Sequence, residues 1–305
     1  MTTRDVSRPD HRAIRDIAAL KARQTPIVMV TAYDYASARA AEASSVDMVL
    51  VGDSAATTML GLASTQDVTL DEMLMITRAV RRGLVRPLLI GDMPFGTYET
   101  SNALAVDTAR RFVQAGCTAV KMEGAGPIAD RVEAVVAAGI PVMGHVGLAP
   151  QQLAAGEVAR VAGRTAEAAL RVLDESIQLQ EAGCFSLIFE AIPAVVARRL
   201  VALIAIPVIG IGAGDGTDGQ VLVAYDLFGL TDGKIPRFVK QYADLKQHMV
   251  RAFTDFAEDV RRRVFPAGDH TYGGVADAEL AALERSLPSV VARCCAQSSW
   301  NDSSS

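Results

Sequence analysis

Four apolar, strand-like runs in the sequence each end in a carboxylate. The runs with their acids are Asp47–Gly52 with Asp53, Pro87–Gly91 with Asp92, Thr118–Met122 with Glu123, and Phe185–Phe189 with Glu190. A charge at one end of a buried strand is costly unless something at that place uses it. When several strands run in the same direction, such carboxylates can meet at one face of one sheet. We therefore expect a single acidic site.

The residue types in this set suit a hard metal ion. Asp53, Asp92 and Glu123 are oxygen donors, the nearest histidine is His145, and no cysteine accompanies them. Mg²⁺ fits such donors best, because it needs few protein ligands and leaves positions for a substrate. A 2-oxo acid can chelate the ion through its carboxylate and keto oxygens, and the ion then acts as a Lewis acid that stabilises an enolate.

Two more side chains extend this chemistry. Lys121 stands two residues before Glu123 in the same run, so strand alternation points both to one face and sends Met122 to the other. Lys121 can offset the charge of an enolate or a carboxylate. Glu190 belongs to a separate run and is free to act as the base for a C–H proton. The set predicts carbon–carbon bond chemistry beside a carbonyl, not hydride or phosphoryl transfer.

The elements that must position these residues alternate along the chain. Strand-like runs begin near Ile27, Asp47, Pro87, Thr118, Pro141, Phe185, Ile206 and Val221. Amphipathic helical patterns cover Thr69–Arg82, Thr100–Ala115, Pro127–Ala138, Thr165–Ala182 and Ile192–Ile204. This alternation predicts βα units and a parallel sheet, and the number of units favours a closed (β/α)8 TIM barrel of about 250 residues. An open, doubly wound sheet is the rival, but no GxGxxG follows the first strand.

The ends of the predicted strands carry a ring of polar residues, where barrel enzymes place their active sites. In chain order the ring is Asp34, Asp53, Ser54, Asp92, Lys121, Glu123, His145 and Glu190, followed by the GIGAG sequence at Gly210–Gly214. Any single Asp or Ser here could instead cap the next helix, and Asp34 is the plainest example. The GIGAG sequence could cradle a phosphate, but a tight turn at the barrel top is the better interpretation.

Composition and the remaining segments narrow the class of protein. The net charge of −5 gives no reason to expect nucleic acid or an anionic membrane as a partner. No apolar stretch reaches the roughly 20 residues that span a bilayer, and the N-terminus lacks a secretory signal. The cysteines have neither disulfide nor zinc spacing, which favours the cytoplasm; they are Cys117, Cys184, Cys294 and Cys295.

Three regions are expected: an N-terminal extension over 1–25, the catalytic barrel over 26–274, and a flexible, serine-rich tail over 275–305. Pro236–Val264 has a helical pattern and is expected to pack outside the barrel or against a neighbouring subunit.

The order of motifs along the chain resembles one family. The motifs TAYDY, VGDS, GDMPFGTYE, VKMEG, GIPVMGHVGLAPQ, FEAIP, IPVIGIGAG, DGQVLV, KIPRFVKQYAD and VFPAGDHTY follow one another between about Ile27 and Tyr272. This order resembles that of the ketopantoate (3-methyl-2-oxobutanoate) hydroxymethyltransferase family. The resemblance implies a barrel of the phosphoenolpyruvate/pyruvate superfamily and usually a decamer. It also implies transfer of a one-carbon unit from 5,10-methylenetetrahydrofolate to 3-methyl-2-oxobutanoate, which gives 2-dehydropantoate for pantothenate biosynthesis.

The resemblance also implies roles for the acidic set and its neighbours. Asp53 and Asp92 match the family's Mg²⁺ site and its link to substrate, and Glu123 matches the third acidic group of that site. Ser54 and Lys121 match contacts to the carboxylate and keto groups of the substrate. Asp53, Ser54, Asp92 and Lys121 are therefore the predicted substrate-binding residues.

The predicted catalytic residues are Glu190, Lys121 and His145. By resemblance Glu190 matches the proposed base, and His145 matches a residue near the transferred hydroxymethyl group.

Two segments depart from the family pattern, at Leu62-Ala63 and at Glu157–Arg160. Both follow predicted strands on the functional face, so drift within the family and a paralogue that acts on a different 2-oxo acid in secondary metabolism both remain open. A superfamily carbon–carbon lyase or mutase is a further alternative, but it should carry a cysteine in a KKCGH-like loop. Cys117 and Cys184 precede strands instead. The intact acidic set argues against a non-catalytic scaffold.

Overall fold

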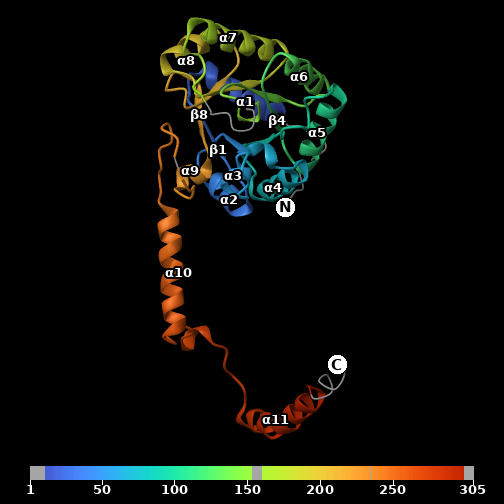
Figure 1. Cartoon of the computed structure of the whole chain (residues 1–305), viewed down its shortest axis with the longest axis vertical. Coiled ribbons are helices and arrows are strands. Elements are labelled where there is room, and N and C mark those ends of the chain that lie inside the picture. Colours follow the sequence, from blue (N-terminus) through green and yellow to red (C-terminus); the bar gives the residue numbers. More distant parts are fainter. Residues whose placement is uncertain (1–10, 153–159, 234, 299–305) are drawn as a thin grey trace. The chain divides into compact units, whose positions relative to one another are not determined.

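The computed structural model describes residues 11–152, 160–233 and 235–298, and its centre is a closed barrel of eight parallel strands (Figure 1). The strands are β1 (Ile27–Thr31), β2 (Met48–Val51), β3 (Leu88–Asp92), β4 (Ala119–Glu123), β5 (Val142–Gly147), β6 (Ser186–Glu190), β7 (Val208–Ile211) and β8 (Gly219–Leu222). Each strand pairs with the next one, and β8 pairs with β1. The predicted TIM barrel and its eight strands are confirmed, and the open doubly wound sheet is wrong.

Helices alternate with the strands and surround the barrel (Figure 1). They are α2 (Tyr35–Ala43), α3 (Ala55–Thr58), α4 (Leu70–Gly83), α5 (Asn102–Ala115), α6 (Pro127–Ala137), α7 (Ala166–Glu181), α8 (Ala194–Val201) and α9 (Ala224–Phe228), with 3-10 turns η1 (Thr65–Asp67) and η2 (Pro150–Gln152). A capping box opens α4, where Thr69 accepts from the Glu72 amide and the Glu72 carboxylate accepts from the Thr69 amide. Gly116, at φ 108°, ends α5 in the left-handed conformation.

Apolar side chains form two cores on the two faces of the strands. The outer core, between strands and helices, includes Phe112, Met122 and Phe189. The barrel interior is filled by alternate strand residues, including Met29, Met48, Leu50, Ile90, Met143 and Ile188. Because successive strand residues face opposite ways, the polar residue two positions beyond an interior apolar residue also faces inward. This alternation lays a polar layer on top of the apolar one, at the carboxyl ends of the strands.

The helix α1 (His11–Ala22) belongs to the opposite end of the barrel. Its Ile17 joins the interior core. The Lys21 Nζ donates to the carbonyl oxygens of Ile204 and Ile206 at 2.9 and 3.0 Å and pairs with Asp218 Oδ2 at 2.9 Å. These partners precede β7 and β8, so α1 is held at the amino-terminal ends of the strands, the end that serves stability in such barrels.

The chain divides into two compact units, with the boundary between Lys246 and Gln247. The predicted regions over 1–25, 26–274 and 275–305 stay predictions. The helix α10 (Leu245–Arg261) begins at this boundary, and the short turn η3 (Gly268–His270) and α11 (Asp277–Ser298) follow it in the second unit. No helix in the described ranges combines the length and the hydropathy that crossing a membrane requires.

The helical prediction for Pro236–Val264 is wrong over its first part, since α10 begins only at Leu245. Proline is tolerated in the first turn of a helix, so Pro236 does not by itself exclude one here. The residues that follow it have other partners: the Tyr242 amide donates to the Leu227 carbonyl at 2.9 Å, and Phe238 lines the pocket described below. Contacts with α9 and with the pocket therefore hold this part of the chain in place of helical hydrogen bonds.

Candidate active site

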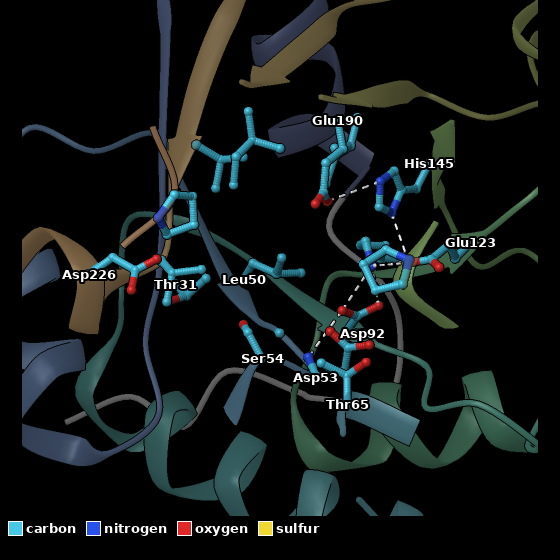
Figure 2. A pocket seen from close by; sticks show the side chains of 18 of the residues that line it. Thr31, Leu50, Asp53, Ser54, Thr65, Asp92, Glu123, His145, Glu190 and Asp226 are labelled. Atoms are coloured by element: carbon cyan, nitrogen blue, oxygen red, sulfur yellow. Dashed lines mark hydrogen bonds and ion pairs between the residues drawn. The ribbon is translucent and has the colours of Figure 1, made fainter. Parts of the chain in front are cut away.

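One pocket at the carboxyl ends of the strands brings together all seven side chains predicted to form the site (Figure 2). They are Asp53, Ser54, Asp92, Lys121, Glu123, His145 and Glu190. The rest of the described lining is mainly apolar and includes Leu50, Ile188, Ile211, Val221 and Val223. The acids, Lys121 and His145 form one side of the pocket, the charged wall, and the apolar residues form its aliphatic floor. This combination suits a small molecule with a charged end and a hydrocarbon end.

Lys121 and Asp92 form the centre of the charged wall. They lie directly opposite each other on β4 and β3, and the Lys121 Nζ is 2.7 and 2.9 Å from the two carboxylate oxygens of Asp92. The same Nζ is 3.7 Å from Glu123 Oε2. Burial alone would lower the pKa of Lys121, but the charges of Asp92, Asp53 and Glu123 raise it above its ordinary value. Lys121 is therefore a fixed positive charge in the pocket.

His145 stands between two glutamates (Figure 2). Its Nδ1 is 3.0 Å from Glu123 Oε2, its partner residue on β4, and its Nε2 is 3.3 Å from Glu190 Oε2. Neither contact has the alignment of a hydrogen bond, so both are electrostatic. Burial would lower the pKa of His145, but the Glu123 carboxylate raises it to about 9. An imidazolium at neutral pH thus links the predicted base, Glu190, to the acidic cluster.

Asp53 has no cationic partner of its own at hydrogen-bond distance among the described residues. Its backbone amide donates to Asp92 Oδ2 at 3.1 Å, and its Oδ2 accepts from Gln151 Nε2 at 2.9 Å. Burial, followed by the neighbouring charge of Asp92, raises the pKa of Asp53 well above its ordinary value, although Lys121 opposes this effect. When both are ionised, Asp53 and Asp92 carry more negative charge than the single ammonium balances, so this environment favours a cation that takes the place of the Asp53 proton.

The fit to Mg²⁺ is good for two of the three predicted ligands. Among the residues that the structure describes, no group of three or more His, Cys, Asp or Glu side chains is arranged to hold a metal. Glu123 faces His145 and Lys121, and its Oε1 accepts from the Gln151 amide at 2.7 Å. Mg²⁺ needs only one or two carboxylates when a substrate and water complete its octahedron. Asp53 and Asp92 supply that number of carboxylates, and Glu123 contacts Lys121 and His145 instead.

Gln151 is a site residue that sequence reasoning missed. This 1% exposed side chain donates from Nε2 to Asp53 Oδ2 at 2.9 Å and to the Met93 carbonyl at 3.2 Å, and its Oε1 accepts from the Tyr98 hydroxyl at 2.7 Å. Its backbone amide also donates to Glu123 Oε1, so Gln151 holds the carboxylates of both Asp53 and Glu123. Its signal in the sequence was the polar end of the GLAPQ stretch that follows β5.

The open alternatives at Asp34 and GIGAG are decided by local contacts. Asp34 caps α2, because its Oδ1 accepts from the Ser37 amide at 2.6 Å. Gly212 has φ +66°, and a Cβ there would lie 2.7 Å from the Phe238 ring. A Cβ on Gly214 would lie 2.3 Å from the Ala194 Cβ. Turn geometry and close packing account for these glycines, as the preferred interpretation expected.

The first departure from the family pattern, Leu62-Ala63, is not part of the described lining of the pocket, but the turn that follows it is. Thr65 lines the pocket, and the Gln66 Nε2 donates to the Gln151 carbonyl at 2.9 Å. Leu62 packs against the outer core. The second segment, Glu157–Arg160, lies largely outside the described residues, which resume at residue 160.

Comparisons with known proteins agree with the resemblance seen in the motifs. A family model described as ketopantoate hydroxymethyltransferase matches residues 11–268. The 3-methyl-2-oxobutanoate hydroxymethyltransferase of Nitratidesulfovibrio vulgaris is 51% identical over 274 residues, which cover 88% of this chain and 89% of that protein. The enzyme of the same name from Geobacillus kaustophilus is 44% identical over 262 residues, or 86% of this chain and 94% of that protein.

Solved structures are similar in fold. Phosphonopyruvate hydrolase, in a complex with oxalate and Mg²⁺, has a TM-score of 0.56 at 14% identity, with 92% of this chain and 98% of that chain covered. A 2,3-dimethylmalate lyase of the PEP mutase/isocitrate lyase superfamily has a TM-score of 0.55 at 16% identity, with 92% and 98% covered. At this identity the likeness concerns the barrel alone.

Proposed function

Because the chain belongs to the ketopantoate hydroxymethyltransferase family, we propose that it transfers a hydroxymethyl group from 5,10-methylenetetrahydrofolate to 3-methyl-2-oxobutanoate. The product is 2-dehydropantoate, a precursor of pantothenate. One observation carries the proposal: the same pocket holds a charged wall for the carboxylate and keto groups and an aliphatic floor for the branched hydrocarbon end.

Asp53 and Asp92 are the residues that would hold Mg²⁺, which when bound supplies a Lewis acid for the oxygens of the 2-oxo acid. Lys121 faces the same place with a permanent positive charge and offsets the negative charge that develops on the keto oxygen. The Ser54 hydroxyl lies 2.8 Å from the Tyr33 hydroxyl. When Tyr33 donates to it, Ser54 can donate to the substrate carboxylate.

Glu190 removes the proton from C3 of the 2-oxo acid, the carbon beside the carbonyl. Its side chain is 18% exposed at the pocket, while the buried His145 imidazolium beside it fixes its orientation. The resulting enolate carbon forms the new bond to the one-carbon unit. Both bonds from the methylene carbon to the folate nitrogens break, and one water supplies the hydroxyl of the new hydroxymethyl group. The proton that Glu190 takes from C3 and the second proton of the water end on the two nitrogens of tetrahydrofolate.

A second candidate is the same transfer to a different 2-oxo acid. The contacts of Thr65 and Gln66 favour considering it, because the altered pair Leu62-Ala63 lies just before the turn η1, which reaches the pocket. The lyase or mutase alternative has less support, since no cysteine lines the pocket among the described residues. We also propose that the enzyme works in the cytoplasm, and as a homo-oligomer, a decamer by family resemblance.

Product formation tests the proposal. The protein is incubated with 5,10-methylenetetrahydrofolate, Mg²⁺ and a panel of 2-oxo acids of different branching, and the products are identified by mass spectrometry. We expect 2-dehydropantoate, with kcat/KM highest for 3-methyl-2-oxobutanoate. A higher kcat/KM for a bulkier or more polar 2-oxo acid would establish the second candidate, and no hydroxymethylated product from any of them would reject both.

A further inference from the structure

Asp226 is a carboxylate on the side of the pocket that faces the charged wall. It lines the pocket and is 8% exposed. Figure 2 shows Asp226 and Thr31 on one side, Glu123 and His145 on the other, and Leu50 between them. The apolar run of β8 leads to Asp226 just as other apolar runs lead to the acids of the charged wall. Neither the metal nor the base chemistry proposed above uses it.

Local contacts aim this side chain. The Ala224 amide at the start of α9 donates to Thr31 Oγ1 at 2.8 Å, which ties the helix to the end of β1. The Thr231 hydroxyl donates to Asp226 Oδ1 at 2.6 Å. A carboxylate can accept about four hydrogen bonds. Among the residues that the structure describes, Thr231 supplies the one side-chain donor to Asp226 and no cation pairs with it.

A buried carboxylate with one neutral donor is costly, so a ligand that brings further donors would be bound favourably. The described lining of the pocket offers no free cation, because Lys121 is paired with Asp92 and the His145 imidazolium lies between Glu123 and Glu190. The missing donors must then come from whatever fills this half of the pocket.

The surroundings of Asp226 suit a flat ring. Phe238 lines the same pocket and is 38% exposed. Its ring packs over Gly212 so closely that a Cβ on residue 212 would lie 2.7 Å from the ring. An exposed ring that is held in place offers a face for stacking. Val221 and Val223, which precede Asp226 in the sequence, also line the pocket with aliphatic side chains. A neutral, flat heterocycle with two adjacent N–H groups matches these features better than a solvated ammonium.

We propose that Asp226 and Phe238 form the subsite for the pteridine ring of the folate donor, an inference that rests on the proposed function. Asp226 accepts the 2-amino and N3 hydrogens of the ring, and Phe238 packs on its face. The pyrimidine end of the ring then lies away from the charged wall. The nitrogens that carry the methylene group point toward Glu190, where the substrate carbon is activated.

The test pairs a change in the protein with a matching change in the ligand. Binding of tetrahydrofolate is measured by anaerobic titration calorimetry in the presence of Mg²⁺ for the wild type, Asp226→Asn and Asp34→Asn. Asn keeps the shape of Asp but places an amide donor against the ring. Asp34 is the matched control, because it caps α2, does not line the pocket, and Asn is an equally good cap. The titrations are repeated with a tetrahydrofolate analogue that carries methyl in place of the 2-amino group.

We expect Asp226→Asn to raise the Kd for tetrahydrofolate about 10- to 100-fold, the effect of losing hydrogen bonds to a charged group. Asp34→Asn should match the wild type. The methyl analogue should bind the wild type at least about tenfold more weakly than tetrahydrofolate but show little further loss in Asp226→Asn. The Mg²⁺-dependent affinity for 3-methyl-2-oxobutanoate should persist in both variants, which shows that the pocket is intact.

If the wild type forms product but Asp226→Asn binds tetrahydrofolate with an unchanged Kd, the subsite is overturned and the proposed function stands. An equal penalty for the methyl analogue in wild type and variant would also overturn it. A wild type that binds the 2-oxo acid but neither binds nor uses the folate would refute the folate part of the proposed function, and the subsite with it.

Discussion

Replacing Gln151 by Met should both destabilise the barrel and weaken its acidic site. Met has a similar length and volume but neither donates nor accepts like an amide. The change removes the bonds from Nε2 to Asp53 Oδ2 and the Met93 carbonyl, and the bond from the Tyr98 hydroxyl to Oε1. The backbone amide of residue 151 still reaches Glu123.

The size of the effect follows from the partners that are left behind. Each buried polar group without a partner costs about 1–3 kcal/mol. Tyr98 keeps a second bond, because its hydroxyl also donates to the Glu123 carbonyl at 3.3 Å. Asp53 loses its side-chain donor, and its carboxylate is already disfavoured by burial. We therefore expect a loss of about 2–5 kcal/mol in the free energy of unfolding.

Urea unfolding measures the stability, and titration calorimetry with 3-methyl-2-oxobutanoate and Mg²⁺ measures the site. Gln178→Met is the matched control, because Gln178 bonds Asp174 at 2.7 Å and the Gly126 amide at 3.2 Å in exposed positions. It should cost less than about 1 kcal/mol and leave ligand affinity unchanged. If Gln151→Met loses no more stability than the control, or binds the 2-oxo acid as tightly as the wild type, the hydrogen bonds of Gln151 do not hold the acidic site.

Three further outcomes follow from the charges in the pocket. In metal-free protein the folded state raises the His145 pKa from 6.5 to about 9, so it binds the proton more tightly than the unfolded chain. The contribution of His145 to the free energy of unfolding should therefore be complete below pH 6.5 and fall by about 3 kcal/mol as the pH rises to 9. A pH series of urea melts should show a smaller fall in His145→Asn. Lys121→Met leaves Asp92 buried without its cation and should cost about 3–5 kcal/mol, with partial recovery in Mg²⁺; a melting temperature that Mg²⁺ does not raise would contradict this. Binding of Mg²⁺ with the 2-oxo acid should release protons near neutral pH, because the pKa of Asp53 is raised, and calorimetry in buffers of different ionisation enthalpy detects them; equal affinity for the 2-oxo acid in chelator would refute the role of the metal.

The barrel and most of its active site were predictable because both depend on local alternation. Lys121 and Glu123 share a face since they are two residues apart, and the parallel register then sets Lys121 opposite Asp92 and Glu123 opposite His145. Each acid of the site could therefore be identified from its position at the end of a single apolar run. The same rule applies to Asp226, but the apolar run before it continues past the end of β8, so its place on the pocket was not evident.

What the sequence did not predict depends on contacts between distant segments. Gln151 bonds Asp53, Met93 and Tyr98, which belong to other segments of the barrel top, and no spacing along the chain indicates such partners. The spacing of Phe238 and Tyr242 fits a helical face, but in the structure Phe238 packs over Gly212 and Tyr242 is largely exposed, and apolar periodicity alone cannot distinguish the two arrangements. Helix α10 therefore starts later than predicted.

Hydrogen exchange at C3 of 3-methyl-2-oxobutanoate tests the central claim, that this pocket forms an enolate beside the carbonyl. The wild type and Glu190→Gln are incubated with the 2-oxo acid and Mg²⁺ in deuterated water, without folate, and loss of the C3 proton signal is followed by nuclear magnetic resonance. We predict rapid exchange in the wild type and exchange slower by about 10²- to 10⁴-fold in Glu190→Gln, at similar affinity for the 2-oxo acid. Equal exchange rates in the two proteins, or no exchange above the protein-free rate in the wild type, would contradict the account.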